Sequence, residues 1–188
     1  MDQLLSSTHR AKLDACLAQA VTPPWRLVST QPFAKHLSVT IEARSDELEL
    51  PHRPIQMRQQ QYVEIVIGRA NVYSVPSAKE VQSLVSLGIF KPLGEVGGIA
   101  AAAFAPFAPY ENGDWTVFLN ISGRERCRYR ALATERPNPF VDCTARLGEY
   151  TAGITFPHDA IAHLPRLFAD ARPLMSRVTS CFDLTEEP

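Results

Sequence analysis

Apolar and polar residues alternate in several stretches of the chain, which is the pattern of β-strands with one buried face. In residues 61–67, Val63, Ile65 and Ile67 fall on one side of the expected strand. Further strands are expected at residues 33–43, 72–75, 100–103 and 150–156, whereas residues 141–147 show no clear period.

Elsewhere the apolar residues recur every three or four positions, as on one face of an α-helix. The first such stretch covers residues 7–21. A second begins after Ser77, which forms a capping box with Glu80, and ends near Gly88. This middle helix is expected to lie on the apolar side of the sheet.

The last apolar stripe with helical spacing runs from Pro157 to about residue 182. Pro165 and Pro173 interrupt it, so two or three segments or a kinked helix are expected. The predicted fold class is α+β: an antiparallel sheet of about five to seven strands with an N-terminal helix, one middle helix and a broken C-terminal helical region. The 188 residues are expected to form a single globular domain.

Residues 104–133 organise this prediction, because two hairpins are expected there. Asn112-Gly113 favours the type I′ turn of a tight hairpin, which would set Tyr110 opposite Trp115 and Pro106 opposite Leu119. Val117, Leu119 and Ile121 would then share one face with Phe104 and Pro106, while Phe107 and Phe118 would share the other.

A second reversal is expected near Gly123. A two-residue loop would bury the arginines that follow, at a high cost in free energy. A three-residue loop, 123–125, instead sets Arg130 opposite Phe118 and Arg128 opposite Asn120. The predicted sheet then has an apolar face and a second face of arginine, asparagine and phenylalanine.

The composition is that of an ordinary globular protein, with 45% hydrophobic and 21% charged residues. The net charge of -1 gives no overall attraction to nucleic acid or to an anionic membrane. Fifteen of the 19 basic residues are arginines, a bias typical of a GC-rich bacterial genome, so single arginines carry little functional information.

The cysteines Cys16, Cys127, Cys143 and Cys181 show no CxxC spacing, which argues against a zinc ribbon. Disulfides remain open, although a chain of this length does not need them. The first residues lack the pattern of a secretory signal, and no apolar run approaches the roughly 20 residues of a membrane helix. A cytoplasmic protein without a membrane partner is expected.

Catalytic arrangements are few. Asp159 and His163 would share a helix face, and Cys127 or Cys143 would complete a Cys-His-Asp set, but no motif activates the thiol. His158 and His163 diverge around a helix, which argues against a metal site. The glycines of residues 94–98 match neither a P-loop nor a dinucleotide motif. No catalytic residue, metal or cofactor is therefore assigned, although an enzyme using His158 and His163 remains an alternative.

The function we expect is a non-enzymatic bacterial protein-interaction module that binds an acidic or polar partner protein. Its element order resembles, in outline, that of small secretion chaperones and toxin-neutralising immunity proteins. Two alternatives stay open: a sheet that stacks single-stranded nucleic acid, and a merely solvated arginine face. The residues expected to bind the partner are Arg126, Arg128, Arg130, Phe118, Asn120 and Phe107.

Overall fold

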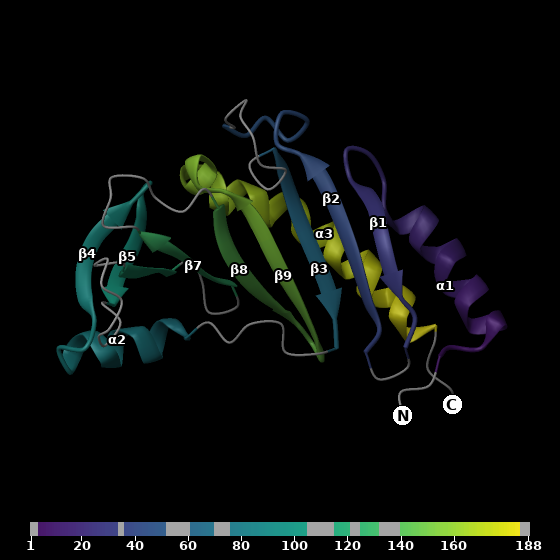
Figure 1. Cartoon of the computed structure of the whole chain (residues 1–188), viewed down its shortest axis with the longest axis horizontal. Coiled ribbons are helices and arrows are strands. Elements are labelled where there is room, and N and C mark those ends of the chain that lie inside the picture. Colours follow the sequence, from purple (N-terminus) through teal and green to yellow (C-terminus); the bar gives the residue numbers. More distant parts are fainter. Residues whose placement is uncertain are drawn as a thin grey trace.

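A single antiparallel sheet of nine strands is the centre of the computed structural model, in the order β1-β2-β3-β9-β8-β7-β6-β5-β4 (Figure 1). The structure describes residues 4–33, 36–51, 61–69, 76–104, 115–120, 125–131 and 140–184. The strands are β1 (Arg26–Gln31), β2 (Ser38–Arg44), β3 (Tyr62–Gly68), β4 (Lys91–Val96), β5 (Ile99–Phe104), β6 (Trp115–Asn120), β7 (Glu125–Ala131), β8 (Phe140–Leu147) and β9 (Tyr150–Pro157).

The helices are α1 (Ser7–Ala20), α2 (Ala78–Ser86), α3 (Leu164–Asp183) and the short 3-10 helix η2 (His158–His163). The predicted α+β class and antiparallel sheet are confirmed, but the described residues alone form nine strands instead of the predicted five to seven. Two strands were not predicted, β1 and β4, and they lie at the two ends of the described sheet. The expected strand at residues 72–75 lies outside the described residues.

One face of the sheet packs against helices and is called the core face here. Its strand residues alternate with those of the second face, as Val63, Ile65 and Ile67 do on β3, each fully buried. α3 lies behind the sheet, across β3 and β2, in Figure 1. It contributes nine buried residues to this core, among them Phe168 and Phe182. Burying these apolar side chains is the main source of the fold's stability.

α3 is continuous through Pro173, although the sequence suggested a break or kink there. Pro173 has no N–H, so the carbonyl of Ala169, four residues earlier, lacks its usual helical donor. Both residues are exposed. Water can therefore satisfy that carbonyl, and the helix continues. Pro165 lies in the first turn of α3, where a missing N–H costs nothing. The expected break falls earlier, at the change from η2 to α3.

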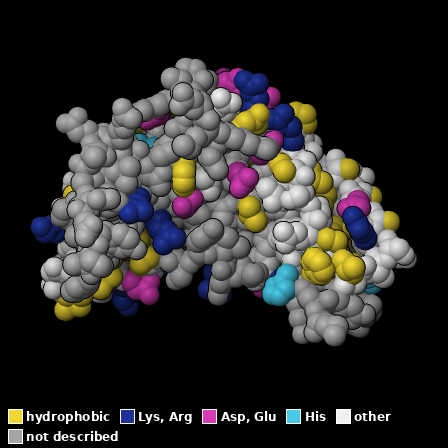
Figure 2. Space-filling model, in the orientation of Figure 1, with side chains coloured by type: hydrophobic (Ala, Val, Ile, Leu, Met, Phe, Trp, Pro, Cys, Tyr) yellow, Lys and Arg dark blue, Asp and Glu magenta, His cyan; other side chains and the backbone are white. Residues whose placement is uncertain are grey.

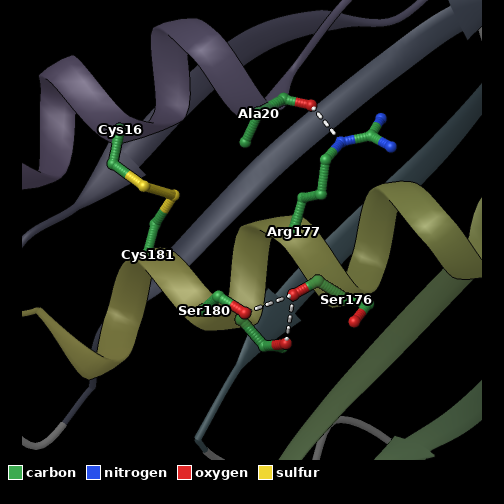
Figure 3. The surroundings of a disulfide bond; sticks show 7 residues. Cys16, Ala20, Ser176, Arg177, Ser180 and Cys181 are labelled. Atoms are coloured by element: carbon green, nitrogen blue, oxygen red, sulfur yellow. Dashed lines mark hydrogen bonds between the residues drawn. A yellow bond between two sulfur atoms is a disulfide. The ribbon is translucent and has the colours of Figure 1, made fainter.

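α1 and α3 are joined covalently by the disulfide between Cys16 and Cys181, whose Cα atoms are 5.6 Å apart (Figure 3). Beside it, Arg177 Nε donates a hydrogen bond of 3.1 Å to the carbonyl of Ala20, at the end of α1. A last-turn carbonyl of a helix needs such a donor because the helix itself supplies none. The disulfide connects residues 165 positions apart in the sequence, and the hydrogen bond connects residues 157 positions apart.

Both terminal strands of the described sheet are irregular. The pairing of β1 with β2 shifts between Leu27 and Ser29, and that of β4 with β5 shifts between Pro92 and Gly94. Bulges and prolines on an outer strand hinder the addition of a further strand. A partner is thus more readily bound by side chains than by extension of this sheet.

We predict that replacing Cys16 and Cys181 by Ser lowers the free energy of unfolding by about 2–4 kcal/mol, because the crosslink closes a very long loop in the unfolded chain. Urea unfolding measures this change. The matched pair, Cys127→Ser with Cys143→Ser, opens a loop of only 16 residues and should cost less. Equal stability of wild type and the first variant would contradict the prediction.

Candidate functional site

The arginines of β7 lie on the second face of the sheet, as predicted. Phe118 pairs with Arg128 and Asn120 with Arg126, so β7 is offset by two residues from the expected register. An even offset keeps every side chain on its predicted face. The prediction assumed that the residues between the arginines face the core, and these residues, such as Cys127, are buried there.

The neighbouring register was predicted wrongly. A tight hairpin at Asn112-Gly113 would set Leu119 opposite Pro106, whereas Leu119 pairs with Ala101. The difference is an odd number of residues, which exchanges the two faces of the partner strand. Pro106 has no N–H to donate to a ladder, while the alanines of β5 offer both backbone groups.

Four arginines and one aspartate are the charged residues that β7 and β8 place on the second face, within the described part of these strands. We call this surface the arginine face, and it comprises Arg126, Arg128, Arg130 and Arg146, with Asp142 and Thr144 between them. Figure 2 views this side of the sheet and shows Lys and Arg side chains over β7, with Asp and Glu further along the sheet.

Contacts within the arginine face partly balance its charge. Arg128 pairs in register with Asp142, whose Oδ1 accepts a 3.0 Å hydrogen bond from the Thr155 hydroxyl. Arg146 Nε lies 3.4 Å from the carbonyl of Gly148. Arg130 is exposed, at the β7 end away from Glu125. Among the described residues of β7 and β8 on this face, the arginines therefore outnumber the aspartate.

α2 covers one end of this same face, which differs from the expectation that it would lie on the apolar side. Its residues Val81, Leu84 and Val85 pack on a small second core of Phe90, Ala102 and Phe118. The rings of Phe90 and Phe118 are stacked, with centroids 5.0 Å apart. Phe118 is only 8% exposed, so it is part of this small core and not a free anchor on the surface.

A cavity of about 410 Å³ lies between α2 and the sheet, and we call it the α2 cavity. Most of its described wall is apolar, and the polar side chains in it are few. Its lining includes Ala78, Val81 and Val85 of α2, Ala100, Ala101 and Ala102 of β5, Phe118 and Leu119 of β6, and the polar residues Gln82, Glu125 and Arg126. Two residues of the expected site, Phe118 and Arg126, thus meet in one cavity wall.

Glu125 was expected in a loop but begins β7 on the core face. Its side chain is 4% exposed, and Arg172 Nε of α3 lies 2.7 Å from its Oε1. This contact raises the pKa of Arg172, first through the hydrogen bond and then through the charge of Glu125. The negative charge next to the cavity is therefore already compensated from the other side of the sheet.

The other candidate residues are placed as follows. Asn120 belongs to β6 by its backbone, and Phe107 lies outside the described residues. The ring of His158 meets that of Tyr129 edge-on at 4.6 Å, and burial raises the pKa of Tyr129. No described His, Cys, Asp and Glu side chains form a cluster of three that would hold a metal ion.

The proposed Cys-His-Asp arrangement is not formed. Cys127 and Cys143 are opposite each other on β7 and β8 and are joined in a disulfide, so neither is a thiolate nucleophile. Asp159 and His163 lie on the 3-10 helix η2, where three residues make a turn and positions four apart do not align.

Residues 94–98 form the end of β4 and a tight turn. Val96 pairs with Ile99, and between them Gly97 and Gly98 have φ values of 59° and 79°. Positive φ at both positions is typical of the type I′ hairpin. At Gly97 a Cβ atom would lie 2.9 Å from a methyl of Ile161, so the turn also packs closely on η2.

A second cavity, of about 490 Å³, lies between the segment that follows α1, the turn after β2, and α3. Its arginines have structural partners: Arg166 donates to the carbonyls of Leu48 and Glu49, and Arg177 to that of Ala20. Glu49 has a φ of 54°, a conformation that these bonds stabilise. This cavity is more polar than the α2 cavity and contains none of the predicted site residues.

Comparisons of the chain with protein-family models, with curated proteins and with solved structures give no match. Among the described helices, none is both long enough and apolar enough to cross a membrane. The assignment of function therefore depends on the geometry of the arginine face and the α2 cavity.

We predict that Arg172→Ala lowers the free energy of unfolding by about 1–3 kcal/mol, because it removes a charged donor from the buried Glu125 carboxylate. The lower end is expected, since Arg172 is itself half exposed to water. The control is Arg10→Ala on α1, whose pair with Asp14 is 3.9 Å long and exposed, and which should change stability by less than about 0.5 kcal/mol. Urea unfolding of both variants measures the difference, and equal effects would refute the role of the pair.

The capping box that begins α2 should make this helix sensitive to acid. The hydroxyl and the N–H of Ser77 donate to the Glu80 carboxylate, and these bonds, followed by the charge of Arg126, lower the pKa of Glu80. A carboxyl with a lowered pKa stabilises the fold above its unfolded pKa and loses that effect as the pH falls through its folded pKa.

We predict that Ser77→Ala lowers the free energy of local opening of α2 by about 1 kcal/mol at neutral pH. The difference from wild type should shrink as the pH falls through the folded pKa of Glu80, because protonation removes the carboxylate that accepts the Ser77 bonds. Amide hydrogen exchange of residues 81–86 measures the opening. The amides of α1, whose cap is Ser6, serve as the internal control and should be unchanged.

Proposed function

We propose that the chain is a non-enzymatic protein-interaction module, such as an inhibitor, an immunity protein or a secretion adaptor, that binds an acidic surface of its partner on the arginine face. The observation that carries the proposal is the set of four arginines against one aspartate on β7 and β8. Guanidinium groups form paired hydrogen bonds with carboxylates, which makes arginine suited to this contact.

The support of the face favours recognition by shape. β7 is an inner strand that pairs with β6 on one side and β8 on the other. The disulfide between Cys127 and Cys143 also joins it to β8. Because the backbone of the strand is already ordered, binding has to order only the arginine side chains. The irregular outer strands β1 and β4 argue for this side-chain contact over strand addition.

The nucleic-acid alternative has less support. Stacking of bases needs exposed aromatic faces beside the cations. Of the two aromatic residues expected to supply one, Phe118 is stacked on Phe90 and buried below α2, and Phe107 lies outside the described residues. The proposal therefore keeps a protein as the partner.

The proposed working environment is an oxidising compartment instead of the cytoplasm expected from the sequence. All four cysteines are paired, as Cys16–Cys181 and Cys127–Cys143. Disulfides persist where thiols are not kept reduced, as in extracytoplasmic spaces.

The test compares proteins captured by the immobilised wild type with those captured by the Arg126→Ala, Arg128→Ala, Arg130→Ala triple variant. Partners specific to the arginine face should be lost by the triple variant and should dissociate from wild type at high salt, because the contact is between charges. The expected loss of affinity is at least about tenfold.

The matched control removes two exposed cations from α1, through Arg10→Ala and Lys12→Ala, and should retain every partner. Circular dichroism establishes that each variant is folded. If the folded triple variant retains all the partners of wild type, the arginine face is not the binding site and the proposal is wrong.

A further inference from the structure

We propose that the α2 cavity receives a large apolar side chain of the partner, while carboxylates next to that side chain in the partner's sequence bind Arg126 and Arg128. The inference rests on the proposed function, because it specifies which chemistry the partner brings to the arginine face. The partner segment is therefore acidic, with a leucine, methionine, phenylalanine or tryptophan among its acidic residues.

The cavity exists because the residues below α2 are too small to fill the space. α2 offers Val81 and Val85 from above, while β5 offers the methyl groups of Ala100 and Ala102 from below. As a result, no residue of α2 is fully buried, although its apolar stripe faces the sheet. Apolar walls without partner atoms lose dispersion contacts, which a guest of suitable shape restores.

The size and lining of the cavity are those of a binding site. A volume of about 410 Å³ lies within the range of about 300–1,000 Å³ that ligand sites occupy. Such sites combine apolar walls with a few polar groups, here Gln82, Glu125 and Arg126. A buried apolar anchor beside charged contacts is also the usual arrangement of the residues that dominate binding energy between proteins.

The charges next to the cavity select an acidic partner. Arg126 lines the cavity and continues directly into the arginine face through Arg128. The carboxylate of Glu125 also borders the cavity, but its charge is compensated by Arg172 at 2.7 Å. Glu80 of α2 also interacts with Arg126 through its charge, but the arginines of the face still outnumber the carboxylates near them. An apolar side chain flanked by carboxylates therefore meets apolar walls and cations, whereas a basic segment meets like charges.

Exposed apolar residues also follow α2 in the chain. Leu87, Ile89 and Leu93 are 72%, 45% and 47% exposed and lie where α2 turns into β4. Figure 2 shows hydrophobic side chains gathered at this corner, at the lower left. Clustered apolar side chains at a surface are typical of a region that a partner covers.

The experiment selects peptides from a phage-displayed random dodecapeptide library on the immobilised full-length chain. The selected sequences should share a large apolar residue close to Asp or Glu. One selected peptide is then synthesised in two forms, with and without replacement of its apolar residue by Ala, and its affinity is measured by fluorescence anisotropy.

Two variants fill the cavity from opposite sides: Ala100→Leu from the sheet and Ala78→Leu from α2. Each should weaken the selected peptide about tenfold, as should truncation of the peptide's own apolar residue. Combining a filled variant with the truncated peptide should weaken binding by less than the sum of the two separate losses in binding free energy, because both changes remove the same contact. Ala18→Leu, on the exposed side of α1, is the matched control and should leave the affinity unchanged. Thermal unfolding of each variant establishes that it is folded.

The outcomes separate this inference from the proposed function. Acidic peptides that need Arg126 but are insensitive to both filled variants would overturn the cavity inference and leave the arginine face intact. A selection without acidic residues would contradict the proposed function itself. Decanoate serves as a small-molecule probe: if it alone binds, and both filled variants abolish that binding, the cavity takes a free amphipathic acid and the inference is wrong.

Discussion

The free energy required to bury arginine decides how β7 lies in the sheet. Its arginines alternate with Cys127 and Tyr129, so the strand has one orientation in which charge faces outward and sulfur and aromatic ring face the core. This orientation fixes the faces of β6 and β8, which pair with β7, and through them those of β9 and β5. The Glu125–Arg172 contact and the Cys127–Cys143 disulfide then hold β7 in place from α3 and β8.

The arrangement of helices follows from the same division into two faces. α3 and α1 bury the core face, where nearly every strand supplies a row of apolar residues. α2 is shorter and covers Phe90, Ala102 and Phe118 on the other side of the sheet. Because β5 offers alanines there, the contact leaves a cavity, and the cavity borders the arginine face. The fold and the proposed function are connected at this cavity, because the loosely packed helix α2 and the arginine face both border it.

Much of the local structure was predictable because neighbouring residues decide it. The capping box of Ser77 and Glu80 correctly located the start of α2, and the alternation of Val63, Ile65 and Ile67 correctly located β3. Gly97-Gly98, between Val96 and Ile99, is as strong a hairpin signal as Asn112-Gly113, on which the predicted register was based. That choice produced the wrong register for β6 and missed β4.

The sequence by itself determined the α+β class, the helix caps, and the face of β7 that displays its arginines, since periodicity and the cost of burying charge act within a few residues. The tertiary structure decided which strands are neighbours, on which face α2 packs, and that Cys16 meets Cys181. These depend on contacts between residues far apart in the chain, whose free energies no local pattern records. Phe118 illustrates the difference: its face was predicted, but its burial required α2 to fold back over it.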